Sequence, residues 1–278
     1  MLFTGAVCVP LSIFYEVNFM PNGFDEQKIR AYAEKFGCGY EIDVIAETDS
    51  TNNVLKKLAV TTDKDGYLLI ARRQTAGRGR LGRSFFSPDS GVYMSLLIRP
   101  NTPPEQTLFF TTAAAVAVCR AIERTTKLTA QIKWVNDVYI GGKKVCGILC
   151  ESAIEHDKTA WTVVGIGVNL AHPKGGFPPE IAEKAAALFE GEAPEGFEEK
   201  FSAALAYELF RLYSDGSFTD VNEYRSRSML IGREITAVTA AGERPCRAIG
   251  IDSAAALIVE YPDGTRGYLN SGEVSVRF

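Results

Sequence analysis

The sequence has few of the residues on which several protein classes depend. It contains six cysteines but no Cys-x-x-Cys pair, and only two histidines, so it has no pattern typical of a structural zinc site. No apolar run is long enough to cross a bilayer. No Gly-x-x-x-x-Gly-Lys-Ser/Thr motif is present, so nothing supports a P-loop ATPase. Scattered cysteines favour reduced thiols and therefore a cytoplasmic location.

Positive charge is not in excess either, because 30 lysines and arginines stand against 34 acidic residues, for a net charge of −4. A chain with this balance is not a general polyanion binder. Residues 71–83, ARRQTAGRGRLGR, are the exception, with five arginines, three glycines and no acid. Since glycine has no Cβ, guanidinium and backbone N–H groups can approach one anion together. We expect this loop to bind a carboxylate or a phosphate, and a solvated basic loop or a nucleic-acid-binding tail is the alternative.

Apolar periodicity and turn residues predict strands and helices over most of the chain. The runs with strand patterns are residues 41–47, 67–73, 91–100, 131–140, 144–152 and 161–170. The runs with helical patterns are residues 49–60, 104–126, 181–190 and 196–213. From about residue 229 the chain changes to short β runs separated by turn residues, which is typical of a small β-barrel.

One of the strand-like runs, residues 131–140 (QIKWVNDVYI), carries polar residues among apolar ones. In a continuous strand, Lys133 and Asp137 would share one face. A lysine in such a run is more often an edge residue whose tip reaches water. Gly141 and Gly142 predict a hairpin directly after this run.

Five short motifs resemble, in their order and spacing, the catalytic region of the biotin protein ligases. They are STN at 50–52, QTAGRGRLGR at 74–83 followed by FFSP, KWVND at 133–137, KKVCGIL at 143–149 and GIGVN at 165–169. The tail that ends in SGEVSVRF resembles the small C-terminal domain of that family. Two positions depart from the family pattern, since Phe85 stands where Trp is frequent and Val135 where Pro is frequent.

The resemblance implies an α+β fold, in which a mixed β-sheet flanked by helices forms a class II synthetase-like catalytic domain and a small β-barrel domain follows it. The expected division is an N-terminal extension with a short helix (1–40), a catalytic biotin- and ATP-binding domain (41–228) and the barrel (229–278). We expect residues 1–19 to result from a translation start assigned too far upstream, or else to be a loosely held extension, because a more ordinary soluble sequence begins at Met20. Fewer than fifty residues precede STN, so we expect a monofunctional ligase without a DNA-binding domain or DNA binding.

The reaction implied by the resemblance has two steps. Biotin, as substrate, is first joined through its carboxylate to the α-phosphate of ATP, giving biotinyl-5′-adenylate and pyrophosphate. The biotinyl group then passes to a lysine of a biotin carboxyl carrier protein or domain. Because two anions have to meet, converging arginine and lysine charges and Mg²⁺ on the phosphates would reduce their repulsion. This chemistry needs no serine or histidine nucleophile.

The resemblance also implies roles for the positions that match these motifs. The catalytic positions are Lys133 and Arg80. The positions implied to bind biotin are Ser50, Thr51, Asn52, Gln74, Arg78, Gly79, Arg80 and Lys133. The positions implied to bind ATP are Arg78, Arg80, Arg83, Asn136, Asp137, Lys144 and Asn169. No protein ligand is assigned to a metal, since Mg²⁺ would be carried by ATP.

Three other readings of the sequence stay open. A lipoate or octanoate ligase or transferase shares the fold family and the carrier-lysine chemistry. A module for single-stranded nucleic acid would use the arginine loop with Phe85 and Phe86 as stacking surfaces. An inactive scaffold would keep only the fold. Exposed strand edges in this fold could serve a homodimer or the carrier contact, and we expect no membrane association.

Overall fold

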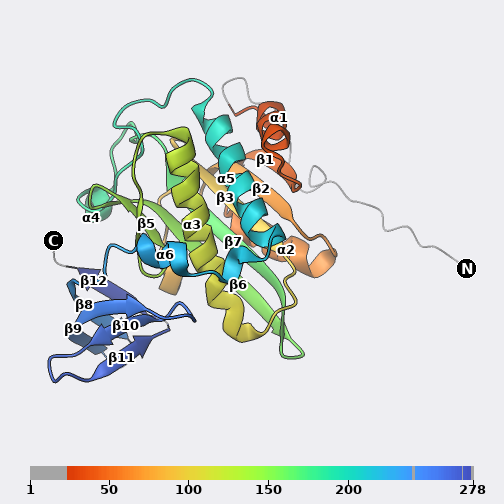
Figure 1. Cartoon of the computed structure of the whole chain (residues 1–278). Helices are drawn as coiled ribbons and strands as arrows, with labels where there is room; N and C mark the ends of the chain where they lie inside the picture. Colours follow the sequence, from red (N-terminus) through yellow and green to blue (C-terminus); the bar gives the residue numbers. More distant parts are fainter. Residues whose placement is uncertain (1–23, 240–241, 271, 277–278) are drawn as a thin grey trace, which may run out of the picture.

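The computed structural model describes residues 24–239, 242–270 and 272–276, and it contains two β-sheets, the larger of which is flanked by helices (Figure 1). The α+β fold class expected from the resemblance is confirmed. The expectation for residues 1–19 falls outside the described residues. None of the helices in the described ranges is both long enough and apolar enough to cross a bilayer.

The larger sheet is mixed. Its strands are β1 (Glu41–Thr48), β2 (Tyr67–Gln74), β3 (Gly91–Ile98), β4 (Gln131–Lys133), β5 (Asp137–Ile140), β6 (Lys143–Glu155) and β7 (Lys158–Asn169). They lie in the order β1-β2-β3-β7-β6-β5-β4, with β1 and β2 parallel and the other neighbours antiparallel. β3 is buried along its whole length, and its β-branched, aromatic and aliphatic residues suit that central place.

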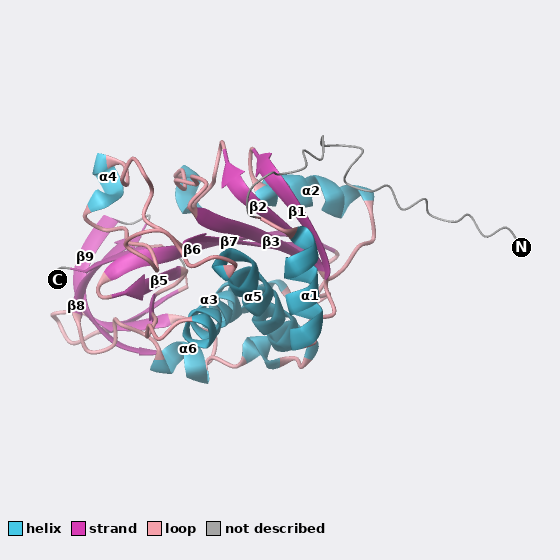
Figure 2. Cartoon of the chain, turned by 90° about the horizontal axis from the view of Figure 1, so that it is seen from above, coloured by secondary structure: helices cyan, strands magenta, loops and turns pink. Residues whose placement is uncertain are grey.

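Helices cover both faces of this sheet. The α-helices are α1 (Glu26–Phe36), α2 (Thr51–Thr61), α3 (Thr107–Thr125), α4 (Pro179–Ala182), α5 (Phe197–Ser214) and α6 (Asn222–Ser226), and the short 3-10 helices are η2 (Arg80–Gly82), η3 (Pro104–Gln106) and η4 (Ser217–Thr219). Figure 2 shows α1, α3 and α5 on one face and α2 on the other. Side chains alternate along β2 accordingly. Leu68 and Ile70 pack in the main core, whereas Tyr67 and Leu69 pack with Leu55 of α2.

The C-terminal part of the chain forms a smaller antiparallel sheet. Its strands are β8 (Glu234–Thr239), β9 (Gly242–Ile251), β10 (Leu257–Glu260), β11 (Arg266–Leu269) and β12 (Glu273–Val276), in the order β11-β10-β9-β8-β12. Within the described residues, the edge strands β11 and β12 do not pair with each other, so the sheet is open and the expectation of a closed barrel is wrong. Closure needs strands that tilt and stagger around an axis, and three of these strands have only four residues.

The helical pattern at 181–190 is also only partly right, because α4 ends at Ala182. Beyond it the chain pairs with β6 instead of continuing a helix. The Lys144 N–H donates to the Lys184 carbonyl, and the Ala186 N–H donates to the Lys144 carbonyl, each at 2.8 Å. This tertiary pairing satisfies the backbone groups that a longer helix would have satisfied internally.

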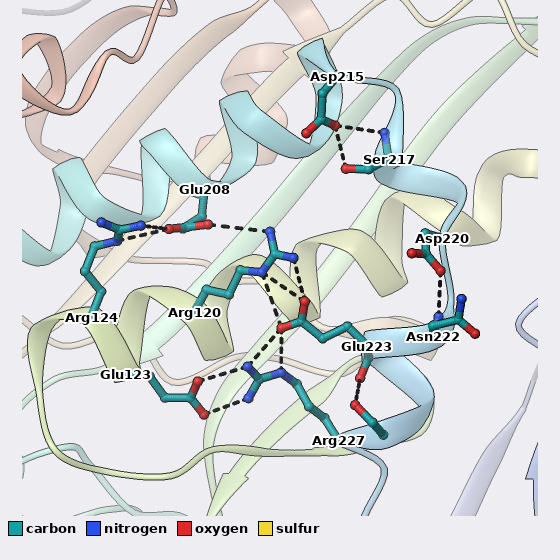
Figure 3. A network of polar contacts seen from close by, with 11 residues as sticks. Arg120, Glu123, Arg124, Glu208, Asp215, Ser217, Asp220, Asn222, Glu223 and Arg227 are labelled. Carbon is teal, nitrogen blue, oxygen red and sulfur yellow. Dashed lines mark hydrogen bonds and ion pairs between the residues drawn. The ribbon is translucent and has the colours of Figure 1, made fainter.

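A series of alternating charges joins α3 to α5 and α6 (Figure 3). The Glu208 side chain on α5 is 2% exposed and its Oε1 lies 2.5 Å from an Arg124 guanidinium nitrogen. Glu223 on α6 accepts hydrogen bonds from Arg120 of α3 and from Arg227. The network therefore holds the segment that leads into the smaller sheet against the buried helix α3.

Replacing Glu223 with glutamine is expected to lower the free energy of unfolding by about 1–2 kcal/mol at neutral pH. Burial raises the pKa of Glu223, but hydrogen bonds and charges from Arg120 and Arg227 outweigh it and lower the pKa below its usual value. Such a carboxylate stabilises the fold above its unfolded-state pKa, and the contribution is lost as pH falls through the folded-state pKa. In urea denaturation the difference between the variant and wild type should therefore shrink as pH falls below about 4.3, the usual pKa of an unfolded glutamate. The exposed Glu190→Gln is the control, and a pH-independent difference for Glu223→Gln would contradict the assignment.

Candidate active site

A polar cleft opens beside β5, β6 and β7, with about 720 Å³ of empty space including the part open to solvent. The predicted residues that line it are Ser50, Thr51, Asn52, Gln74, Arg78, Gly79, Arg80, Arg83, Asn136, Asp137 and Lys144. The other lining residues are Ser84, Phe85, Gly147, Ile148, Leu149, Gly165, Ile166 and Gly167. The fold thus brings all five sequence motifs to one place.

Two predicted positions lie outside this lining. Lys133 is on β4, where its Nζ lies 5.8 Å from the centre of the Tyr139 ring. Asn169 ends β7 and is 8% exposed, and its Nδ2 donates to the Ala186 carbonyl at 2.9 Å. That contact holds the neighbouring loop. The ligand roles of Lys133 and Asn169 stay predictions.

The N-terminus of α2 meets the end of β2 through a directed set of hydrogen bonds. Gln74 Oε1 accepts from the Thr51 N–H at 2.9 Å and from the Thr51 hydroxyl at 3.1 Å. Gln74 Nε2 donates to Ser87 Oγ, which donates to the Phe85 carbonyl. Ser50 occupies the N-cap position with extended backbone, but its side chain makes no capping bond. The helix start is therefore stabilised by Gln74, and the Ser50 side chain is left at the cleft.

Glycines of β6 and β7 form the floor of the cleft. Gly147 and Gly167 are register partners, and a Cβ on Gly167 would lie 2.5 Å from the Phe85 ring. A Cβ on Gly165 would overlap the Asn52 amide oxygen. The GIG sequence in this chain therefore lets an aromatic ring and an amide approach the sheet backbone closely.

The arginine loop folds back on itself at the rim of the cleft. Arg78 and Ser84 form an isolated antiparallel bridge, and the Gly79 N–H donates to the Arg83 carbonyl at 2.8 Å. Arg80 reaches into the cleft, where its Nη1 donates to Asn136 Oδ1 at 3.1 Å. The loop tip, Leu81, has a positive φ of 56° and is 71% exposed. The backbone of the loop is therefore hydrogen-bonded to itself, while Arg78, Arg80 and Arg83 line one cleft.

Among the described residues, the cleft has cationic groups but no activated thiol. Lys144 Nζ lies 2.7 Å from Asp137 Oδ1, so this lysine stays close to the carboxylate at the cleft wall. Burial raises the pKa of the nearby Cys150 thiol to about 12. At neutral pH this sulfur is a protonated thiol, which is a poor nucleophile. The geometry suits binding and orientation of anions better than covalent catalysis by this cysteine.

Comparisons with known proteins agree with this site. Residues 44–169 match the Biotin/lipoate A/B protein ligase family, and residues 230–277 match the Biotin protein ligase C terminal domain. The chain is 33% identical over 262 residues to the bifunctional ligase/repressor BirA of Bacillus subtilis, covering 91% of this chain and 79% of that protein. It is 33% identical over 228 residues to the biotin–[acetyl-CoA-carboxylase] ligase of Paracoccus denitrificans, covering 80% of this chain and 95% of that protein.

This chain belongs to the biotin protein ligase family.

A solved structure has the same fold. The biotin protein ligase of Aquifex aeolicus, in complex with biotin and ATP, superposes with a TM-score of 0.70 at 27% identity, over 85% of this chain and 98% of that one. The match of residues 230–277 is to a domain of biotin protein ligases, which favours biotin over the lipoate or octanoate alternative.

The lysine motif of this family member is not one continuous strand, which corrects the sequence expectation for 131–140. β4 and β5 form a hairpin, in which Lys133 pairs with Asp137. The chain reverses there because Trp134 and Val135 are both buried, with Trp134 Nε1 donating to the Ala255 carbonyl in the turn between β9 and β10. Lys133 and Asp137 still share a face, but as cross-strand partners.

Two polar residues behind the cleft were missed by the sequence analysis. Ser95 is fully buried in β3, and its Oγ lies 2.7 Å from both Thr51 Oγ1 and Asn52 Oδ1. Glu151 on β6 accepts hydrogen bonds from Asn52 and Arg78. Two sequence features could have indicated them: Ser95 is a hydroxyl residue within the apolar run GVYMSLLI, and Glu151 is an acid directly after GILC.

Proposed function

We propose that this chain activates biotin with ATP to biotinyl-5′-adenylate and transfers the biotinyl group to a lysine of a biotin carboxyl carrier protein or domain. One observation carries the proposal. A single cleft gathers the polar residues at the start of α2, the arginine loop and the Asn136, Asp137 and Lys144 group. The relatives named as biotin ligases, and the Aquifex aeolicus structure with biotin and ATP, support the same reading.

Two groups of residues that line the cleft suit the two substrates. Thr51, Asn52 and Gln74 line it with uncharged polar side chains, which suit the ureido end of biotin. Arg78, Arg80 and Lys144 bring positive charge to the lining of the same cleft, in which the biotin carboxylate and the α-phosphate would meet. Their charges would lower the repulsion between the two anions and stabilise the charge that develops as the phosphoanhydride bond to pyrophosphate breaks.

The residues that line the cleft fit an Mg²⁺ ion bound together with ATP. The Asp137 carboxylate lines the cleft and is an oxygen ligand of the kind that Mg²⁺ prefers, alongside phosphate oxygens. When bound, the ion would neutralise phosphate charge. Lys144, which is paired with Asp137, would remain close enough to share that task.

Replacing Arg80 with glycine is expected to shorten the lifetime of bound biotinyl-adenylate by about tenfold, because a charge-assisted contact to the anion is lost. Arg80 is held toward the cleft by Asn136, so the guanidinium is placed before ligand binds. Released adenylate would then label lysines of a bystander protein. Leu81→Gly at the same loop tip adds flexibility but keeps the charge, so it is the matched control. Equal adenylate retention in Arg80→Gly and wild type would contradict this role.

The first test of the proposed function is mass spectrometry of the purified protein after incubation with Mg-ATP and biotin. Lipoate and octanoate are tested in parallel. We expect retained biotinyl-adenylate, and biotin transfer after a carrier domain is added. Lipoyl- or octanoyl-adenylate in its place would overturn the proposal, and so would the absence of any adenylate.

The remaining expectations are proposals of the same kind. We place the catalytic domain at 41–228 and the small domain at 229–278, because the two sheets fall within these ranges. We also propose that the protein acts in the cytoplasm and does not bind DNA as part of its function. Salt-sensitive, sequence-specific binding to duplex DNA would overturn the last point. Sedimentation at several concentrations would decide whether a homodimer forms.

A further inference from the structure

A carboxylate behind the cleft joins groups from α2 and from the arginine loop. Glu151 is on β6, and its side chain is 20% exposed. Its Oε1 lies 2.8 Å from Lys56 Nζ of α2. Its Oε2 accepts from Asn52 Nδ2 at 3.0 Å and from Arg78 Nη1 at 2.9 Å. Glu151 is not itself among the residues that line the cleft, whereas Asn52 and Arg78 are.

The Asn52 amide is held from two opposite sides. Its Nδ2 donates to Glu151 and to the Leu149 carbonyl at 3.1 Å. Its Oδ1 accepts from the buried Ser95 hydroxyl. Since the donor and acceptor ends have different partners, only one orientation of the amide satisfies them all. The absence of a side chain at Gly165 leaves room for that orientation.

The Arg78 side chain is held in a similar way. Its Nη1 donates to Asn53 Oδ1 of α2 at 3.0 Å as well as to Glu151. The loop is thereby fastened to α2 through the same carboxylate that orients Asn52. Two proposed biotin-binding side chains on separate elements thus depend on one residue that does not itself line the cleft.

We propose that Glu151 is a positioning residue of this site, whose carboxylate, opposite the Ser95 hydroxyl, orients Asn52 and holds Arg78 against α2 before biotin arrives. The inference rests on the proposed biotin-binding function of the cleft. Pre-organised binding groups lose less entropy on binding, so Glu151 should act on affinity for biotin rather than on the chemical step.

The ionisation of Glu151 agrees with this role. Burial raises its pKa, but hydrogen bonds from Lys56 and Asn52 and the charges of Lys56 and Arg78 outweigh burial and lower it. The group is therefore a carboxylate at neutral pH. Glutamine has nearly the same shape but no charge, and it can accept from Asn52 while it no longer attracts the two cations.

The test is Glu151→Gln, with Glu155→Gln as the matched control on the same strand. Glu155 lies at the exposed end of β6, so it undergoes the same chemical change away from the site. Biotin affinity is measured by calorimetry without nucleotide, and kcat and KM by biotin-dependent pyrophosphate exchange. We expect the Kd and the KM for biotin to rise about tenfold in Glu151→Gln, with kcat within about twofold of wild type. Glu155→Gln should leave all three unchanged.

Ser95→Ala gives an independent second variant, because it removes the hydrogen bond to Asn52 Oδ1 on the side opposite Glu151. We expect it also to raise the KM for biotin while kcat is kept. The proposal is overturned if a folded Glu151→Gln protein binds biotin like wild type, or if kcat falls as much as affinity. Should Glu151→Gln fail to fold, an unchanged biotin KM in Ser95→Ala overturns it. Failure of the proposed function is seen separately, as wild-type protein that neither binds biotin nor forms its adenylate.

Discussion

Lys133→Ala is expected to slow adenylate formation by about 10³-fold, the effect of removing one charge that stabilises a developing oxyanion. Lys133 lies opposite Asp137 in the β4–β5 hairpin, and Asp137 lines the cleft. The Lys133 side chain therefore shares a face of the hairpin with the Asp137 carboxylate, which lines the cleft. When the biotin carboxylate approaches the α-phosphate, the Lys133 charge would offset the growing repulsion. Biotin-dependent exchange of labelled pyrophosphate into ATP measures this step without a carrier protein.

The control for this prediction is Lys143→Ala. Lys143 begins β6 next to the same hairpin, but it is exposed and its cross-strand partner is Ile140, which does not line the cleft. It should exchange pyrophosphate at the wild-type rate, because it removes the same charge at an exposed position that does not pair with a cleft residue. A near-normal rate in Lys133→Ala would remove Lys133 from the chemistry, while the proposed function would still be judged by adenylate formation in the wild type.

Gly165→Ala is expected to weaken biotin binding by about 100-fold, the effect of misplacing a binding group by roughly 1 Å. A Cβ at this position would overlap the Asn52 amide, and it would lie 2.7 Å from Asn52 Cγ. Asn52 is only 4% exposed and is bonded to Ser95 and the Leu149 carbonyl, so it cannot move aside without breaking those bonds. One methyl group should therefore disorganise the polar end of the cleft.

Calorimetric titration with biotin measures this loss, and thermal unfolding shows how much stability goes with it. Gly175→Ala is the matched control, because its Cβ would meet nothing within 4 Å and its φ is not in the left-handed region. We expect that variant to bind biotin like wild type. Unchanged biotin binding in Gly165→Ala would mean that the position of Asn52 is not important for biotin.

Local sequence patterns predicted most of the secondary structure where one periodicity dominates. The strand predicted at 67–73 is β2 (Tyr67–Gln74), and the helix predicted at 196–213 is α5 (Phe197–Ser214). The Gly141-Gly142 hairpin is also confirmed, with positive φ at both glycines. These elements were predictable because adjacent residues decide them, through apolar alternation or through turn residues that accept left-handed backbone.

Elements decided by distant partners were not predictable in the same way. The run at 131–140 has strand-forming residues throughout, yet it reverses where Trp134 donates to the Ala255 carbonyl in the β9–β10 turn and Tyr224 donates to the Val135 carbonyl. Residues after Ala182 leave the helical pattern to pair with Lys144. In both places, long-range hydrogen bonds and burial outweigh local propensity.

By itself, the sequence determined the fold class, the family and most of the residues that line the cleft, because short motifs preserve the types and spacing of groups that the chemistry needs. Only the tertiary structure decided that Ser95 and Glu151 orient Asn52, and that Gly165 leaves room for it. It also showed that Asn169 holds a neighbouring loop through Ala186. Such roles depend on which side chains are in contact across strands that are far apart in the chain. Sheet register determines those contacts, and sequence spacing does not.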